Sequence, residues 1–219
     1  MSSFTLPNSS PECQVNLVPE LSENQLLKFP AFKQWLSTLQ HTLSTQQSKT
    51  HPFRDSPYKL RKIDIQSVDF FGGNRIGFIK LKAEISNDND EKLPGSVFLR
   101  GGSVGILMIL QPDDVSPNSD EDKHVIMTLQ PRVPAGSLTF AELPAGMLDG
   151  GTFSGSAAKE ISEETGLEVP GDQLVDMTEL ALSSTEPSHS NEEKLQRAVY
   201  PSAGGSDEYI PLMLYQKRI

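Results

Sequence analysis

The sequence predicts an α+β fold built around a mixed β-sheet, and two hydrophobic patterns lead to this expectation. Residues 24–47 repeat their apolar side chains mostly at three- and four-residue intervals, which is typical of an amphipathic helix. From Lys59 onward the apolar period changes to two, which is typical of strands with one buried face. Several strands around one short central helix indicate an α+β domain with a mixed sheet.

Length and composition fit a protein whose core needs no disulfide or structural metal. The 219 residues suit one large domain, or one domain with an N-terminal extension, and can bury a sizeable core. Cys13 is the only cysteine, so no bridge forms within the chain and a reducing compartment is expected. No apolar run reaches the ~18 residues of a membrane span, and the N-terminus lacks the features of a signal or transit peptide. We therefore expect a cytoplasmic protein.

The net charge of −10 excludes two classes of partner. Nucleic acids and anionic membranes both bind basic surfaces, so we expect neither as a partner. An acidic protein still binds a phosphate ester when metal ions bridge the two.

The N-terminal part divides into a tail and a helix-and-hairpin region. Residues 1–23 are rich in Ser, Pro and Asn and are expected to form a mobile tail. Residues 24–94 begin with the predicted helix, in which Pro30 lies near the start or at a kink. We interpret its apolar stripe as packing on its own domain, with a partner-binding groove as the alternative.

The remaining elements follow from the period of two and from turn residues. A Gly-rich turn at residues 72–74 joins the first two strands as a hairpin. A helix is predicted over about residues 154–165 and ends at Gly166, a residue type that commonly terminates helices. Residues 172–182 are ambiguous, with strand expected in the second half, and residues 185–196 form a polar insertion. The expected strands are residues 59–70, 76–85, 96–100, 102–111, 124–130, 140–144 and 209–216, with the third and fourth as two strands or one broken strand.

Three glutamates of the predicted helix share one face. Glu160, Glu163 and Glu164 lie three and four residues apart, which brings their carboxylates together. Mg²⁺ prefers carboxylate and carbonyl oxygens and leaves coordination sites for substrate phosphates. Residues 163–166 alone favour a solvated acidic helix end. The Pro-Ala-Gly turn and the Gly-rich loop that precede the helix favour a metal site instead.

The stretch from Glu142 to Leu167 resembles the Nudix box. That pattern is a glycine, five residues, a glutamate, seven residues, then Arg-Glu-apolar-any-Glu-Glu-any-Gly-apolar, and every required position from Glu160 onward matches. The resemblance implies a Nudix αβα sandwich with a mixed sheet, here preceded by an N-terminal helix and β-hairpin. It also implies catalysis by Glu160, Glu163 and Glu164. The Ala145 carbonyl, Glu160 and Glu164 would bind Mg²⁺ or Mn²⁺, with Glu163 as a further or alternate ligand.

The sequence departs from the Nudix box at two places. Thirteen residues separate Gly146 from Glu160 where the pattern has fourteen, and the first glutamate of the box falls on Gly151 or Thr152. The arginine before the key glutamate is Lys159, which keeps the charge but lacks the bidentate fork. We expect a less precise loop and a retained metal site.

Two flanking motifs resemble those of the ADP-ribose and ADP-sugar pyrophosphatases. Residues 129–134, Leu-Gln-Pro-Arg-Val-Pro, match the Gln-x-Arg strand of that branch. The match implies that Arg132 reaches the substrate's phosphates, although a lone arginine at a strand end is also typical of an ordinary surface. Residues 200–208 resemble the Ser-Pro-Gly-x-x-x-Glu motif, with Ala203 in place of the proline, and imply a substrate-binding role for Glu208.

The likeness covers about residues 95–219, the expected Nudix domain, and is strongest to the plant and fungal ADP-sugar diphosphatases. It implies a homodimer that hydrolyses the diphosphate bond of a nucleoside diphosphate sugar, such as ADP-ribose or ADP-glucose. The products are a nucleoside monophosphate and a sugar phosphate. In this branch a loop glutamate after the last motif is the general base. The resemblance therefore places the base beyond Ile219 and describes the chain as C-terminally truncated.

The alternative is a truncated or degenerate Nudix protein that binds a metal–nucleotide complex, or dimerises, without turnover. The sequence does not choose the base and sugar of the substrate. Phe70 or Phe71 could stack on the base, and each is equally well explained as a core residue.

Overall fold

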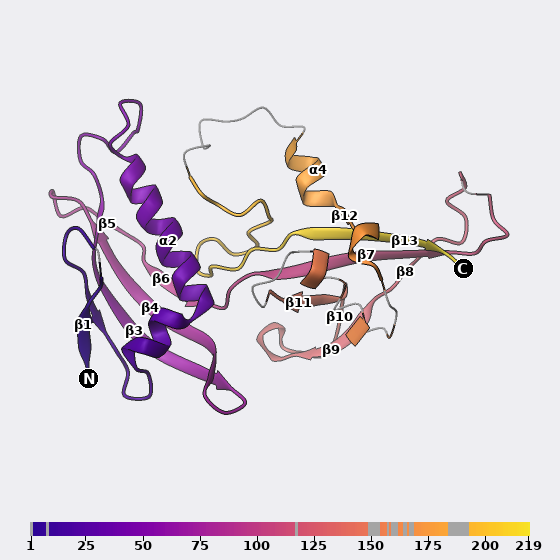
Figure 1. The fold of residues 1–219 in the computed structure, drawn as a ribbon, viewed down its shortest axis with the longest axis horizontal. Coiled ribbons are helices and arrows are strands. Elements are labelled where there is room, and N and C mark those ends of the chain that lie inside the picture. The colour runs from indigo at the N-terminus through magenta and orange to yellow at the C-terminus, as the bar shows by residue number, and fades with distance from the viewer. Residues whose placement is uncertain are drawn as a thin grey trace. The chain divides into compact units, whose positions relative to one another are not determined.

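The computed structural model describes residues 2–7, 9–116, 118–148, 154–156, 158, 162–163, 166, 169–183 and 193–219 (Figure 1). The described residues form two compact units. The first holds the chain through Gly101, with residues 193–196 and Tyr200–Glu208, and the second holds the rest. The chain thus passes from one unit to the other after Gly101, instead of at the expected domain start, residue 95.

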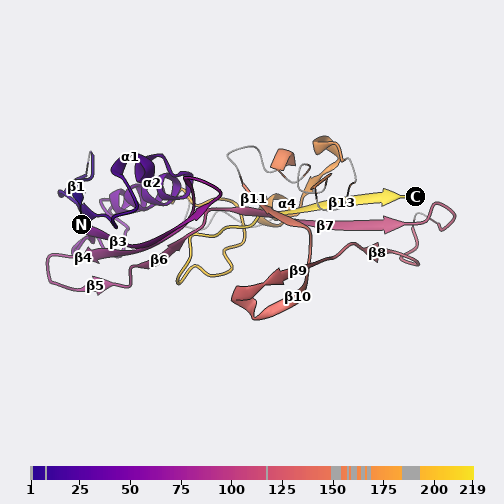
Figure 2. The ribbon, with the colours of Figure 1, turned by 90° about the horizontal axis from the view of Figure 1, so that it is seen from below.

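The first unit is a six-stranded sheet with two helices on one face (Figure 2). Its strands are β1 (Ser3–Thr5), β2 (Gln14–Asn16), β3 (Lys59–Phe71), β4 (Arg75–Ser86), β5 (Lys92–Leu93) and β6 (Ser96–Leu99). β3 and β4 form the expected antiparallel hairpin, and β4 also pairs with β5 and β6. β2 runs parallel to β3 and antiparallel to β1.

The two helices, α1 (Glu23–Lys28) and α2 (Pro30–Thr45), replace the single helix expected over residues 24–47. The Ser22 hydroxyl accepts a hydrogen bond from the Gln25 N–H, and the Gln25 side chain accepts one from the Ser22 N–H, which starts α1 with a capping box. Pro30 is the first residue of α2, where its missing N–H is not needed. Buried Phe32 packs α2 on the core of this unit, as the first interpretation of the stripe predicted.

The segment before α1 belongs to the core, so the expected mobile tail at residues 1–23 is wrong for the described residues of that segment. The Leu6 N–H donates to the Cys13 carbonyl (2.8 Å) and closes the loop between β1 and β2. Burial of apolar side chains stabilises this arrangement. Strands of three residues are too short to show a period of two in the sequence. The buried side chains of the segment are Leu6, Cys13, Val15, Leu17 and Leu21.

The second unit contains a five-stranded sheet. Its strands are β7 (Ser103–Gln111), β8 (His124–Val125), β11 (Ala145–Met147), β12 (Val175–Asp176) and β13 (Leu212–Arg218). β13 runs parallel to β7, whereas β8, β11 and β12 pair antiparallel with their neighbours. The sheet is therefore mixed, and the predicted α+β class is confirmed. Val104, Ile106 and Met108 of β7 are fully buried, as its continuous apolar sequence requires.

A separate hairpin in the second unit consists of β9 (Thr128–Arg132) and β10 (Ser137–Glu142). A short 3-10 turn joins the strands and ends at Gly136, whose φ of +69° favours glycine. Figure 2 shows this hairpin set apart from β7 and β13. Its Leu129 and Leu138 side chains are largely exposed.

The second half of residues 172–182 is helical, so the expected strand there is wrong. After the two-residue strand β12, α4 spans Met177–Ser183. The Asp176 carboxylate accepts a hydrogen bond from the Glu179 N–H (2.8 Å), an N-terminal cap that favours helix over strand. Thr178 fixes the helix to the sheet, because its hydroxyl accepts a hydrogen bond from the Leu212 N–H (2.8 Å). Within the described part of the chain, every helix is too short or too polar to cross a membrane.

Candidate functional site

The backbone around Ala145, the predicted carbonyl ligand, is fixed by the central strand of the second unit. Ala145 begins β11 and pairs with Gly105 of β7. On its N-terminal side the Ile106 N–H donates to the Pro144 carbonyl (2.9 Å). On its C-terminal side the Leu148 N–H donates to the Gly102 carbonyl (3.0 Å). A rigid turn of this kind can present a backbone carbonyl to a hard cation.

Close packing against the same turn requires glycine at position 102. A Cβ atom on Gly102 would lie 2.5 Å from the Tyr209 ring and 2.9 Å from Leu148 Cδ1. Both distances are shorter than van der Waals contact allows, so a larger residue would displace the start of β7 or the turn.

The proposed metal-binding helix is described only in part. Residues 154–156, 158 and 162–163 are helical, and Glu163 is exposed. The helix ends at Gly166, whose φ is +72° and whose N–H donates to the Ser162 carbonyl (3.1 Å), as predicted. Glu160 and Glu164 lie outside the described residues, as do Gly151, Thr152 and Lys159.

The metal-ligand set therefore stays a prediction. Where the structure describes side chains, it gathers no three carboxylates, imidazoles or thiols that could hold a metal ion. Of the three predicted glutamates, only Glu163 is among the residues that the structure describes. The exposed end of a helix is nevertheless where carboxylates could meet a hydrated cation and a phosphate.

Arg132 and Glu142 bind each other across the β9–β10 hairpin. The Arg132 Nε donates to Glu142 Oε1 (2.8 Å) and Oε2 (3.1 Å), and Nη2 donates to Oε1 as well. The Arg132 side chain is 42% exposed and that of Glu142 is 20% exposed. A guanidinium fork binds carboxylates and phosphates with the same geometry. In this structure the Arg132 guanidinium, the group that would bind a phosphate, binds the Glu142 carboxylate.

Glu208 lies in a loop that is held against β6 of the first unit. Its carboxylate forms an ion pair with Arg100 Nη1 (2.9 Å), and the Glu208 side chain is only 15% exposed. The Phe98 N–H donates to the Gly205 carbonyl (2.8 Å) and so adds the loop to the edge of β6. The turn at Ser202 is tight, because its carbonyl accepts from the N–H groups of Gly205 (3.0 Å) and Ser206 (2.9 Å).

Three residues of these clusters were not singled out by sequence patterns. Arg100 and Asp207 are linked across more than 100 positions of the chain, and the Asp207 carboxylate binds the Arg100 N–H (2.8 Å). Glu142 is the first residue of the segment that resembles the Nudix box, yet its pairing with Arg132 depends on the hairpin register. The one sequence feature that could have pointed to Arg100 is its position immediately before Gly101 and Gly102.

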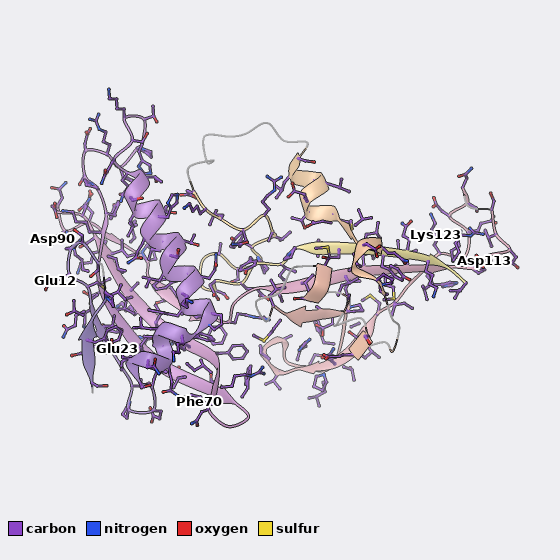
Figure 3. All side chains as sticks on the ribbon, viewed as in Figure 1. Glu12, Glu23, Phe70, Asp90, Asp113 and Lys123 are labelled. Atoms are coloured by element: carbon purple, nitrogen blue, oxygen red, sulfur yellow. The ribbon has the colours of Figure 1, made fainter. Side chains whose placement is uncertain are left out.

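Phe71 is part of an aromatic cluster in the first unit. Its ring meets the Phe78 ring edge to face, with centroids 4.9 Å apart, and Phe78 in turn contacts Phe98 (5.1 Å). The ring also lies over Gly77, where a Cβ would come within 2.6 Å of it. Phe71 is therefore a packing residue, and Phe70 lies next to it near the turn end of the β3–β4 hairpin (Figure 3).

Comparison with known proteins identifies a homologue over most of the chain. Nudix hydrolase 14, chloroplastic, from Arabidopsis thaliana is 36% identical over 191 residues, which are 86% of this chain and 53% of that protein. The chain thus spans about half the length of this relative. No protein-family model matches the chain. A crystal structure of an ADP compounds hydrolase covers 73% of this chain and 69% of its own with 15% identity and a TM-score of 0.42, a likeness too weak to bear on function.

Proposed function

We propose that this chain, which belongs to the Nudix hydrolase superfamily, hydrolyses the diphosphate bond of a nucleoside diphosphate sugar with the help of Mg²⁺. One observation carries the proposal: Glu160, Glu163 and Glu164 have the mutual spacing of the Nudix box and follow the turn at Ala145 with one residue fewer than the box has. The hydrogen bonds that fix this turn on β7 support it, because a metal ligand on the main chain needs a rigid backbone. Mn²⁺ is the alternative ion.

The proposed chemistry follows from charge. The oxygens of a diphosphate repel an attacking nucleophile, so the site has to neutralise them before water can add to phosphorus. Bound Mg²⁺ would supply that neutralisation and lower the pKa of a coordinated water. Glu160 and Glu164 would hold the ion, Glu163 would act as a further or alternate ligand, and the Ala145 carbonyl would complete the protein's share of the ligands.

Arg132 and Glu208 would bind the substrate. The Arg132 fork would exchange the Glu142 carboxylate for a phosphate oxygen, since both partners suit the same planar donor geometry. Glu208 would accept hydrogen bonds from a hydroxyl group of the substrate, and its ion pair with Arg100 would keep its carboxylate oriented.

The finer assignments rest on the resemblance to the ADP-sugar pyrophosphatase branch. They are a substrate such as ADP-ribose or ADP-glucose and a homodimer. The proposed cytoplasmic location rests instead on the single cysteine of the sequence, which is typical of a reducing compartment. The name of the Arabidopsis relative places that protein in the chloroplast. Size-exclusion chromatography with light scattering decides the proposed dimer, because a mass of twice 24.0 kDa is expected and a single 24.0 kDa species contradicts it.

A second candidate function is metal-dependent nucleotide binding without turnover. Lys159 in place of the arginine and Gly151 or Thr152 in place of the first glutamate favour it, because both changes remove groups that brace the loop of the box. The two functions differ in products. Incubation with ADP-ribose, ADP-glucose and UDP-glucose in Mg²⁺ should release AMP or UMP together with a sugar phosphate. Retention of intact nucleotide on the protein, with no product, would favour the second function.

A further inference from the structure

The loop Tyr200–Glu208 belongs to the first unit, although the segments on both sides of it, Arg197–Val199 and Tyr209–Ile219, belong to the second. Something must hold the loop on the first unit. Its main chain pairs with β6 at one residue, where Phe98 and Ser206 form an isolated parallel bridge. A single bridge is a weak attachment, so the side chains of the residues that follow Ser206 must contribute much of the binding of the loop to the first unit.

The Asp207 carboxylate is the strongest of these attachments. Oδ1 accepts hydrogen bonds from the N–H groups of Arg100 (2.8 Å) and Gly101 (3.1 Å), and Oδ2 accepts a second one from Gly101 (3.1 Å). Gly101 has a φ of +80°, a conformation that favours glycine and exposes successive N–H groups to one acceptor. Hydrogen bonds to a charged acceptor are stronger than neutral ones.

Arg100 connects this anchor to Glu208. Its main-chain N–H binds Asp207, and its guanidinium Nη1 binds the Glu208 carboxylate (2.9 Å). The Arg100 side chain is 31% exposed and that of Glu208 is 15% exposed, so the ion pair is partly shielded from water. A shift of the Arg100 backbone would move the guanidinium and, with it, the carboxylate of Glu208.

We propose that Asp207 is a positioning residue for Glu208, because it fixes the main chain of Arg100 and Gly101 and thereby the guanidinium that binds Glu208. The proposal rests on the substrate-binding role assigned to Glu208 in the proposed function. Asp207 does not touch the substrate in this account. It acts through Arg100 and through its own place next to Glu208 in the chain.

Hydrogen exchange of the full chain without substrate tests the anchor. Asp207→Ala should speed exchange of the Arg100 and Gly101 amides by about tenfold or more, because it removes both acceptor oxygens. Asp207→Asn keeps one acceptor oxygen and should stay close to wild type. Asp69→Asn, an exposed acid on β3, is the matched control and should change neither amide. Wild-type exchange in Asp207→Ala, with the other strands equally protected, would overturn the proposal.

A double-mutant cycle tests whether Asp207 acts through Glu208. Hydrolysis of ADP-ribose in Mg²⁺ is measured for wild type, Asp207→Ala, Glu208→Gln and the double variant. We expect Asp207→Ala to lower kcat/KM by roughly tenfold in the wild-type background and by about twofold or less beside Glu208→Gln. Asp207→Asn should restore most of the activity. Equal losses in both backgrounds would show that Asp207 has only a general structural role.

The two measurements separate the failure of the inference from the failure of the proposed function. If the wild-type chain releases no AMP, the hydrolase proposal fails, and the exchange rates of Arg100 and Gly101 still decide whether Asp207 anchors the loop. If Asp207→Ala folds poorly, the variants Asp207→Asn and Asp207→Glu are compared with each other instead. The longer side chain of the glutamate displaces the carboxylate while it keeps the charge, so faster exchange and lower kcat/KM are expected for Asp207→Glu alone.

Discussion

Arg132 Nε donates to both carboxylate oxygens of Glu142, at 2.8 and 3.1 Å, across the two strands of the β9–β10 hairpin. Glu142 is followed by Leu143 and then by the Pro144-Ala145 turn, whose carbonyl we assign to the metal. The pair therefore links the proposed phosphate-binding arginine to the chain segment that leads into the proposed metal site.

Replacement of Arg132 by alanine tests its contact with the diphosphate. We expect a loss of roughly 1.5–3 kcal/mol of substrate interaction, the range for hydrogen bonds to charged groups. The measurement is the Kd of a non-hydrolysable ADP-ribose analogue in Mg²⁺, with Arg75→Ala, an exposed arginine of β4, as the control. Equal affinity of Arg132→Ala and wild type would make Arg132 an ordinary surface residue.

Replacement of Glu164 by glutamine tests the metal site. The variant should bind Mg²⁺ more weakly, because an amide oxygen is a poorer ligand for a hard cation than a carboxylate. Its stability should match or slightly exceed that of wild type, since repulsion among the neighbouring carboxylates falls. Calorimetric Mg²⁺ titration of this variant, of wild type and of the exposed control Glu193→Gln decides the matter. Unchanged affinity would remove Glu164 from the site.

The pH dependence of stability tests the burial of Asp207. Burial raises the pKa of this carboxyl above its ordinary value of 3.8, while hydrogen bonds from the Arg100 and Gly101 main chain oppose the rise. Tyr200, Arg100 and Glu208 are the other titratable groups around it. Since the folded-state pKa exceeds the unfolded one, its stabilising contribution is complete below the unfolded pKa and is lost as pH rises through the folded pKa.

Asp207→Asn, which has no charge to desolvate, should therefore gain stability relative to wild type as the pH rises above the ordinary carboxyl pKa of 3.8. Urea unfolding of both proteins at several pH values above that point measures the difference. A difference that stays constant or shrinks as pH rises would contradict the stated direction.

Replacement of Leu17 by alanine tests whether the N-terminal segment is part of the core. Leu17 is 4% exposed, so the cavity should destabilise the first unit by roughly 2–5 kcal/mol. Trp35 of α2 is the only tryptophan of the chain, and its fluorescence reports unfolding of that unit. Ser3→Ala is the control, because Ser3 is exposed at the edge of the sheet. Equal unfolding midpoints for Leu17→Ala and wild type would favour the expectation that residues 1–23 form a mobile tail.

Hydrophobic periodicity and turn residues predicted the elements that depend on neighbouring residues of the chain. The period of two and the turn at residues 72–74 predicted the β3–β4 hairpin, and Gly166 marked the end of a helix. Pro30 was expected near the start or at a kink of one helix, whereas it begins the second of two. The strands β1 and β2 were not predicted, because three residues show no period and the pairing of β2 with β3 is distant in sequence. The start of α4 depends on a cap by the Asp176 carboxylate. The sequence signal for this cap was weak, because Asp176 also ends the short strand β12.

The candidate site divides in the same way. The Nudix box is a contiguous motif, so the resemblance to it pointed to the glutamates and to the Ala145 turn as candidates. Arg100, Asp207 and the Arg132–Glu142 pair depend on which strands lie side by side. The break at Gly101, where the expected third and fourth strands enter separate sheets, is what brings the Arg100 main chain to Asp207. No period or spacing in the sequence contains that information.

The most direct test of the hydrolase assignment is AMP release from ADP-ribose by the purified chain, measured with Mg²⁺, with a chelator, and with the variants Glu160→Gln and Glu193→Gln. We predict AMP and a sugar phosphate in equal amounts with Mg²⁺ for wild type and Glu193→Gln. Loss of product is expected with the chelator, and a decrease of at least ~10²-fold is expected for Glu160→Gln, because removal of the ion removes the neutralisation of the diphosphate. Release of AMP that survives both the chelator and Glu160→Gln, or no release from any nucleoside diphosphate sugar, would contradict the account.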